Sequence, residues 1–170
     1  MRQRGHSLAT ELLYAGMVSA TRHVATALGV ATGDLVVRIT RRRFVDGEPI
    51  ALQTSYLRPE MAALMDDPGV ASGSLYEAME RCFGRRPTEG REEYTAVVVA
   101  GDDANLLGLP NGSACLAVRR FARSRDGYLV EYAESLLRGD RYTLYVDLGN
   151  TAGEARQAKV SGDSSKGLRR

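Results

Sequence analysis

The sequence predicts an α+β fold in which one antiparallel β-sheet carries short helices packed against it. Two Asp-Gly pairs, Asp46-Gly47 and Asp126-Gly127, each separate two runs rich in β-branched and aromatic residues. Such pairs are typical of tight hairpins between antiparallel strands. Helical patterns are short and do not alternate regularly with the strands, so repeated βαβ units and a parallel sheet are not expected. The pattern predicts about six or seven strands with three or four helices.

The composition is that of one compact domain. The chain has 170 residues, of which 44% are hydrophobic and 26% charged, and this length supports a single hydrophobic core. No apolar run reaches the length of a membrane span, and the N-terminus lacks the apolar region of a signal peptide. We therefore expect a cytoplasmic protein without membrane contact. Cys82 and Cys115 are expected to be buried thiols, since no pattern supports a disulfide.

The first half of the chain is predicted to alternate between strands and short helices. Residues 8–17 are expected to form a strand, although their propensity also fits a helix. Ser19 or Thr21 is expected to cap a helix that ends at Gly29. The hairpin of residues 35–57 follows, and Pro59 then opens another short helix.

The next helix is predicted from Ser74 to Gly84, because Ser74 and Glu77 have the spacing of a capping box. After a polar loop, residues 94–99 contain a Val-Val-Val run that predicts a buried strand. Asp102 or Asp103 is then expected to cap a short helix. The remaining strands are predicted as follows: residues 113–123, 128–137 and 141–148.

Two arginines stand out in the first hairpin. Side chains alternate between the two faces of a strand, so Leu35, Val37 and Ile39 share a face with Arg41 and Arg43. That face is otherwise apolar and should face the core, where an unpaired guanidinium is costly. An anionic partner is therefore expected, and it is either an internal carboxylate or a bound ligand.

The C-terminal part differs in composition from the rest. Residues 149–170 are rich in Gly, Ser and Ala and carry five basic residues against two acidic ones, whereas the whole chain has a net charge of only +2. We predict a domain over residues 1–148 and a disordered basic tail over 149–170. Without the tail the body is slightly acidic, so direct binding of nucleic acid by this domain is not expected.

Recognisable catalytic patterns are missing from the sequence. It has no phosphate-binding glycine loop, no nucleophile elbow and no cluster at metal-ligand spacing, and His6 and His23 are its only histidines. An enzyme, a metal site and a cofactor are therefore not expected. Four polar residues remain as candidate pocket residues: Ser74 and Tyr76 at a helix start, Gln53 in the hairpin, and Glu131 in a later strand. Each also has an ordinary structural interpretation, as a cap, packing residue, exposed amide or ion-pair partner.

A series of motifs in order carries a resemblance to a known family. The series is Leu28-Gly29, Arg41-x-Arg43 before Asp46-Gly-Glu-Pro49, Ser55-Tyr-Leu57 with Pro59, Gly73-Ser-Leu-Tyr76, Leu106 to Gly112, Asp126 to Tyr132, and Arg138 to Leu148. No single motif is specific, but their shared order over residues 5–148 resembles the UTRA effector-sensing domain of GntR-type transcriptional regulators of the HutC subfamily.

The resemblance implies a chorismate-lyase-like α+β fold that binds a small anionic effector and forms a homodimer. In that family the domain follows a winged helix-turn-helix that binds operator DNA, and no such domain is present in this sequence. By resemblance, Arg41, Arg43, Ser74 and Tyr76 hold the effector's phosphate or carboxylate. Glu131 and the Gln53 position then contact its polar end.

Two alternative functions and three departures from the family pattern remain open. The same fold also supports a chorismate-lyase-type enzyme, and a ligand-free dimerisation module would keep the arginines paired with internal carboxylates such as Glu131. The family commonly has a Ser/Thr-rich segment upstream, which is short or absent here, and an acidic residue where this chain has Gln53. Family members often carry a tyrosine where this chain has Leu136-Leu137. The class of effector is therefore not predicted beyond a sugar phosphate or carboxylate.

Overall fold

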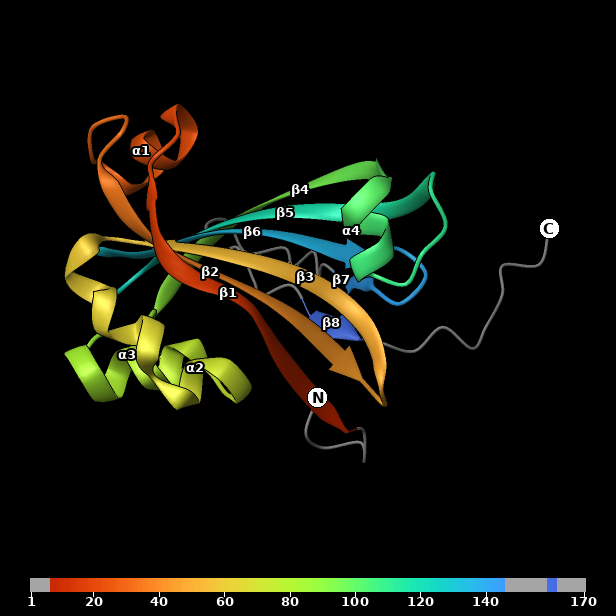
Figure 1. The fold of residues 1–170 in the computed structure, drawn as a ribbon, viewed down its shortest axis with the longest axis horizontal. Coiled ribbons are helices and arrows are strands. Elements are labelled where there is room, and N and C mark those ends of the chain that lie inside the picture. The colour runs from red at the N-terminus through yellow and green to blue at the C-terminus, as the bar shows by residue number, and fades with distance from the viewer. Residues whose placement is uncertain (1–6, 146–158, 162–170) are drawn as a thin grey trace, which may run out of the picture.

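The computed structural model describes residues 7–145 and 159–161 of the chain. Six strands form one sheet in the order β1-β2-β3-β6-β5-β4, and every neighbouring pair is antiparallel (Figure 1). The strands are β1 (Leu8–Ser19), β2 (Leu35–Val45), β3 (Glu48–Leu57), β4 (Glu89–Val99), β5 (Ser113–Arg123) and β6 (Leu129–Arg138). The predicted α+β class with an antiparallel sheet is confirmed.

The β2–β3 hairpin turns at the predicted Asp-Gly pair. Asp46 has φ 51° and Gly47 has φ 81°, and two successive positive φ angles match the twist of the flanking strands. Arg41 is paired in register with Gln53, and Ile39 with Ser55. All four side chains therefore lie on one face of the sheet.

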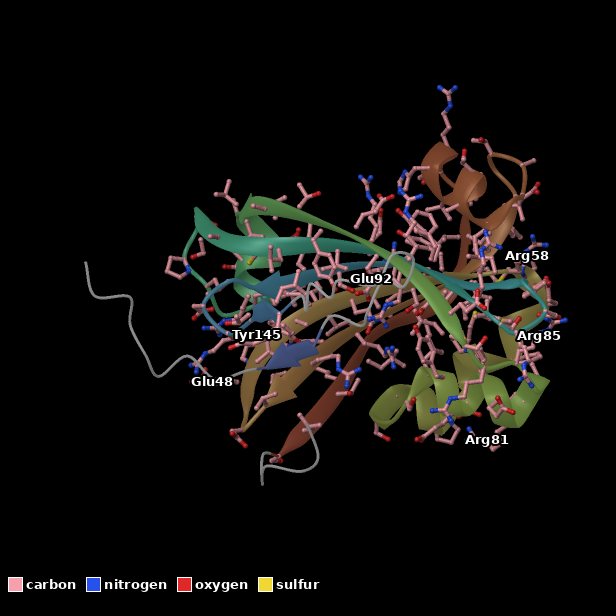
Figure 2. The ribbon with its side chains drawn as sticks, turned by 180° about the vertical axis from the view of Figure 1, so that it is seen from behind. Glu48, Arg58, Arg81, Arg85, Glu92 and Tyr145 are labelled. Carbon is pink, nitrogen blue, oxygen red and sulfur yellow. The ribbon has the colours of Figure 1, made fainter. Side chains whose placement is uncertain are left out.

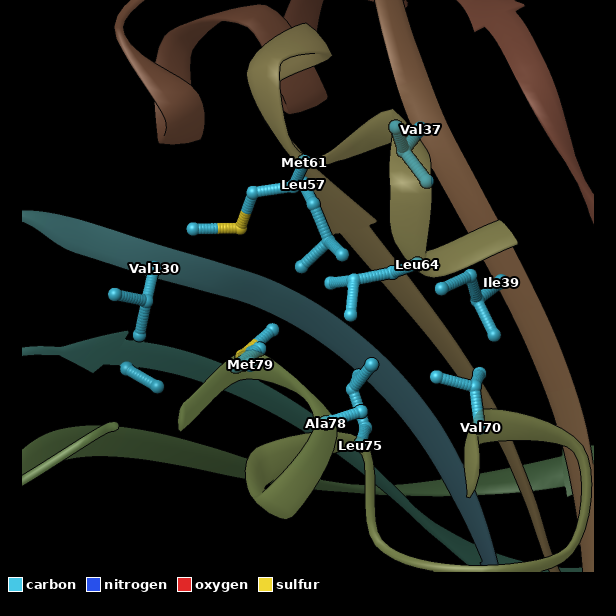
Figure 3. Packing of buried hydrophobic residues seen from close by; sticks show 11 residues of the cluster. Val37, Ile39, Leu57, Met61, Leu64, Val70, Leu75, Ala78, Met79 and Val130 are labelled. Atoms are coloured by element: carbon cyan, nitrogen blue, oxygen red, sulfur yellow. The ribbon is translucent and has the colours of Figure 1, made fainter. Parts of the chain in front are cut away.

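Three helical segments cover one half of that face. They are the 3-10 helix η2 (Pro59–Asp66), α2 (Pro68–Ser72) and α3 (Leu75–Phe83). Figure 3 shows their buried residues, among them Leu64, Leu75 and Met79, packed against Val37 and Ile39 of β2. Ser74 caps α3 as predicted, because its Oγ accepts a hydrogen bond from the backbone N–H of Glu77 over 3.3 Å. The sequence did not predict α2.

The opposite face carries the other two helices at its two ends. Helix α1 (Arg22–Leu28) packs on Val36 and Tyr132, and Gly29 ends it with φ 67° as predicted. Helix α4 (Gly101–Leu106) packs on Leu52. No helix within residues 7–145 is both long enough and apolar enough to cross a membrane.

Some local predictions were wrong. The Val-Val-Val run is not buried throughout: β4 is an edge strand in which Val98 is 75% exposed while Val99, on the other face, is buried. The thiol of Cys82 is free and exposed on α3, although Cys115 is buried as expected. Helix α4 begins after Ala100, so the two aspartates lie in its first turn instead of capping it.

The last predicted strand does not join the main sheet. Strand β7 (Thr143–Tyr145) pairs instead with β8 (Lys159–Ser161), which lies within the segment predicted to be disordered. The other residues of that segment, and residues 146–148, lie outside the described part of the chain. The predicted boundary at residue 148 stays a prediction.

Candidate functional site

A cavity of about 400 Å³ lies between the sheet and the start of α3. Strands β1, β2, β3 and β5 contribute one part of its wall, and residues 72–77 contribute the other. The wall residues that carry polar groups include Thr10, Arg41, Arg43, Gln53, Ser74, Tyr76 and Arg120. Its volume falls in the range of sites for small metabolites.

Arg41 is the most unusual residue of the wall. Its side chain is only 3% exposed, and Nη2 donates one hydrogen bond, to Oε1 of Gln53 over 3.3 Å. Nε and Nη1 are buried and have no hydrogen-bond partner among the described residues. Burial lowers the pKa of Arg41, while the negative charge of Glu131 acts in the opposite direction. A buried cation with unused donors favours an anion beside it.

Arg43 lies two residues further along the same strand. Alternation places it on the same face as Arg41, and it lines the same cavity. Its partner in β1 is Thr10, which also lines the cavity. Neither Arg41 nor Arg43 forms an ion pair with a described residue.

The start of α3 lines the same cavity as the two arginines. Ser72, Gly73 and Ser74 line the wall there. The first N–H groups of a helix have no partner within the helix, and the helix dipole makes this end positive. The cavity therefore combines two arginines with a helix N-terminus, and both favour a negatively charged group.

Glu131 lies behind the wall instead of in it. Its side chain is fully buried, and its carboxylate accepts hydrogen bonds from the hydroxyl groups of Ser55, over 2.5 Å, and Tyr76, over 2.6 Å. Burial and the neighbouring Glu131 raise the pKa of Tyr76. The hydroxyl of Tyr76 thus connects the cavity to a buried negative charge.

Arg120 is a wall residue that the sequence did not predict. This residue of β5 lines the cavity, and its Nη1 donates to the hydroxyl of Tyr76 over 3.2 Å. Its Nε donates to Oε1 of Glu92 in β4 over 2.5 Å. The sequence contained a signal for it. Arg120 shares a strand face with Val118 and Ala122, just as Arg41 shares a face with Val37 and Ile39.

The structure thus brings five of the six predicted site residues into one wall, namely Arg41, Arg43, Gln53, Ser74 and Tyr76. Glu131 is adjacent but has no exposed surface. In Figure 2 this face of the sheet is seen with α2 and α3 toward one end, β8 toward the other, and Glu92 between them. Within the described residues no group of three potential metal ligands is present.

Comparison with known proteins gives a consistent result. A family model described as the UTRA domain matches residues 3–143. The transcriptional repressor NagR of Bacillus subtilis is 28% identical over 149 residues, which cover 86% of this chain and 61% of that protein. The chain spans about 50–61% of the length of the curated relatives it matches.

Solved structures agree with the sequence relatives. The crystal structure of the effector domain of PhnF from Mycobacterium smegmatis superposes with a TM-score of 0.71 at 26% identity, covering 82% of this chain and 86% of that domain. The crystal structure of PhnF from the same organism gives a TM-score of 0.75 at 25% identity, covering 88% of this chain and 66% of that one.

Proposed function

The chain belongs to the UTRA domain family, and on this basis we propose that it senses a small anionic metabolite for a GntR-type bacterial regulator of the HutC subfamily. Its relatives include a transcriptional repressor and a domain described as an effector domain. The proposed effector is a sugar phosphate or a carboxylate. Binding would change how an attached winged-helix domain, outside this sequence, binds operator DNA.

The buried guanidinium of Arg41 is the single observation that carries this proposal. A side chain that cannot lose its charge is held in the cavity wall with two nitrogen atoms that have no partner among the described residues. A bound anion would supply the acceptors that these atoms lack. Arg43 and the start of α3 supply further positive potential at the same place.

The alternative of a filled, ligand-free module has less support. It requires internal carboxylates to pair with Arg41 and Arg43. Glu131 is the nearest candidate, but both of its oxygen atoms accept hydrogen bonds from hydroxyl groups of Ser55 and Tyr76. The cavity is also open to a ligand of metabolite size.

Signalling requires the effector to favour one of two conformations. A ligand shifts such an equilibrium only by the difference between its affinities for the two states. Thr10 of β1 and Ser74 at the start of α3 both line the cavity, so a ligand held between them can favour one relative position of these elements. In a homodimer, that shift would alter the spacing of two DNA-binding domains.

Thermal unfolding against a panel of small anions tests the proposal. The panel contains inorganic phosphate, sugar phosphates, phosphonates, aliphatic and aromatic carboxylates, and chorismate. An anion at about 100 times its Kd stabilises the native state by about 2.7 kcal/mol. We expect one chemical class to raise the Tm, and the double variant Arg41→Ala/Arg43→Ala to lose that response.

The same experiment separates the competing functions. Arg91→Ala/Arg125→Ala is the matched control, because it removes two arginines that do not line the cavity. A response that survives in the Arg41/Arg43 variant would refute the site, and a flat panel would favour the ligand-free module. A parallel assay for product formed from chorismate tests the enzyme alternative, and turnover would favour an enzyme over a sensor.

A further inference from the structure

We propose that Arg120 is a specificity-determining residue that donates hydrogen bonds to the end of the effector remote from its anionic group. This inference rests on the proposed function, because it assumes that Arg41 and Arg43 hold the anion. It adds a second contact point on a different strand. The effector is then a molecule with an anionic group at one end and an uncharged oxygen, such as a hydroxyl or carbonyl, at the other.

The position of Arg120 in the sheet supports a second contact point. Strand order places β5 three strands from β2, and neighbouring strands lie about 4.8 Å apart, so the two backbones are about 14 Å apart. Both arginines nevertheless line the same cavity. The backbones of Arg41 and Arg120 therefore border the cavity three strands apart, and a ligand longer than a single small anion can contact both side chains.

The hydrogen bonds of Arg120 leave part of it available. A guanidinium carries five N–H groups. Nε donates to Glu92, Nη2 forms an ion pair with the same carboxylate, and Nη1 donates to the hydroxyl of Tyr76. Two N–H groups therefore have no partner among the described residues. The side chain is 41% exposed and lines the cavity.

The charges nearby indicate which kind of group Arg120 receives. Glu92 already neutralises Arg120 through the ion pair, whereas Arg41 and Arg43 together carry one positive charge more than the buried Glu131 behind them. The excess positive charge therefore lies at the Arg41 end. A neutral acceptor suits Arg120, because a second anion there would also meet the negative field of Glu92.

Glu92 and Tyr76 hold the guanidinium of Arg120 in place. Arg120 and Glu92 are direct partners in the β4–β5 register, and a carboxylate that contacts two nitrogen atoms restricts the rotation of the guanidinium. Tyr76 contacts the third nitrogen from α3. Glu92 is accordingly a positioning residue, and its removal should weaken the contact without abolishing it.

Matched ligands provide the test. Inorganic phosphate probes the anion site alone, whereas hexyl phosphate and sorbitol 6-phosphate share a six-carbon chain but differ in hydroxyl groups. Calorimetric affinities would be measured for the wild type, Arg120→Gln, Arg120→Lys, Glu92→Gln and Arg41→Ala. Unliganded Tm values would be measured in parallel, because a folding defect would lower them.

The wild type should bind sorbitol 6-phosphate at least tenfold more tightly than hexyl phosphate. Arg120→Gln should remove this preference and change phosphate affinity less than threefold, and Arg120→Lys should retain part of it. Glu92→Gln should reduce it by a smaller factor. Arg41→Ala should weaken all three ligands.

Three results would overturn the inference. They are a wild type without preference for the polyol, a preference that persists in Arg120→Gln, and a loss of phosphate affinity in Arg120→Gln as large as the loss of polyol affinity. If Arg41→Ala left phosphate binding unchanged, the proposed function itself would fail. The two failures are therefore distinguishable.

Discussion

The hydroxyl of Tyr76 lies 2.6 Å from the carboxylate of Glu131, although 55 positions separate the two residues in the sequence. Tyr76 belongs to α3 and Glu131 to β6, so this hydrogen bond fixes the helix that borders the cavity to the centre of the sheet. It also places the phenol group beside a fully buried charge. The stability of the fold and the shape of the cavity therefore depend on the same contact.

Replacing Tyr76 by Phe should destabilise the protein. Glu131 would keep the hydrogen bond from Ser55 but lose one of its two donors, and a hydrogen bond to a charged group contributes about 1.5–3 kcal/mol. Urea denaturation measures the change in the free energy of unfolding. Tyr128→Phe is the matched control, because Tyr128 donates to the exposed Glu60 and that carboxylate can bind water instead. Equal losses in the two variants would contradict this account.

Replacing Arg41 by Met should leave the stability unchanged or raise it. Methionine keeps most of the aliphatic volume and removes a buried cation with two unpartnered nitrogen atoms, whose desolvation costs free energy in the folded protein. Relief of that cost should offset the lost attraction to Glu131. The anion-dependent rise in Tm should be lost. The measurements are urea denaturation without ligand and thermal unfolding with it.

Arg138→Met is the control for that prediction. Arg138 is similarly buried, but its nitrogen atoms donate to Asp140 and to the carbonyl groups of Pro49 and Leu107. Removing these donors should cost about 2–3 kcal/mol, since the two carbonyl groups lose a partner. A larger loss of stability for Arg41→Met than for Arg138→Met would contradict this prediction, because it would show that the guanidinium of Arg41 has stabilising partners in the folded protein.

The free energy of unfolding should fall at alkaline pH. Burial raises the pKa of Tyr94 and of Tyr128 to about 12, from the ordinary value of 10.0. The folded state therefore retains these protons while the unfolded state releases them, so their contribution is complete below pH 10 and is lost as the pH rises through 12. Urea denaturation between pH 9 and 12 measures the slope. Tyr94→Phe/Tyr128→Phe should make it shallower, and an unchanged slope would assign the effect to other groups.

Two neighbouring valines of β4 should respond differently to substitution. Val98→Thr should change the free energy of unfolding by less than about 0.5 kcal/mol, because this side chain is 75% exposed. Val99→Thr places a hydroxyl in the core and should cost about 1–3 kcal/mol. Thermal unfolding of both variants compares the same chemical change at two depths.

Much of the fold could be predicted from local patterns. Asp46-Gly47 indicated the first hairpin, and Ser74 with Gly84 indicated the bounds of α3, because turns and caps depend on residues close in sequence. The position of β4 at the sheet edge could not be predicted, since strand order depends on contacts between distant segments. The prediction that the whole valine run is buried therefore failed at Val98, whereas Val99 is buried.

The candidate site shows the same division. Arg41 and Arg43 could be identified from the alternation within one strand. Predicting Arg120 would have required knowing that β5 and β2 border one cavity. Its position on the same strand face as Val118 and Ala122 gave only a weak indication. Glu131 lies behind the cavity wall and not in it, because alternation gives the face of a strand and not the depth of a side chain.

Much of the cavity wall consists of side chains on strands, and this determines how easily its chemistry can change by substitution. Positions 41, 43, 53 and 120 project from strands whose backbone hydrogen bonds do not depend on the identity of these side chains. Single substitutions at these positions can therefore exchange one chemical preference for another while the scaffold persists. Such an architecture permits gradual evolutionary change in the chemistry of the wall, and it accords with solved structures that share the fold at only 25–26% identity.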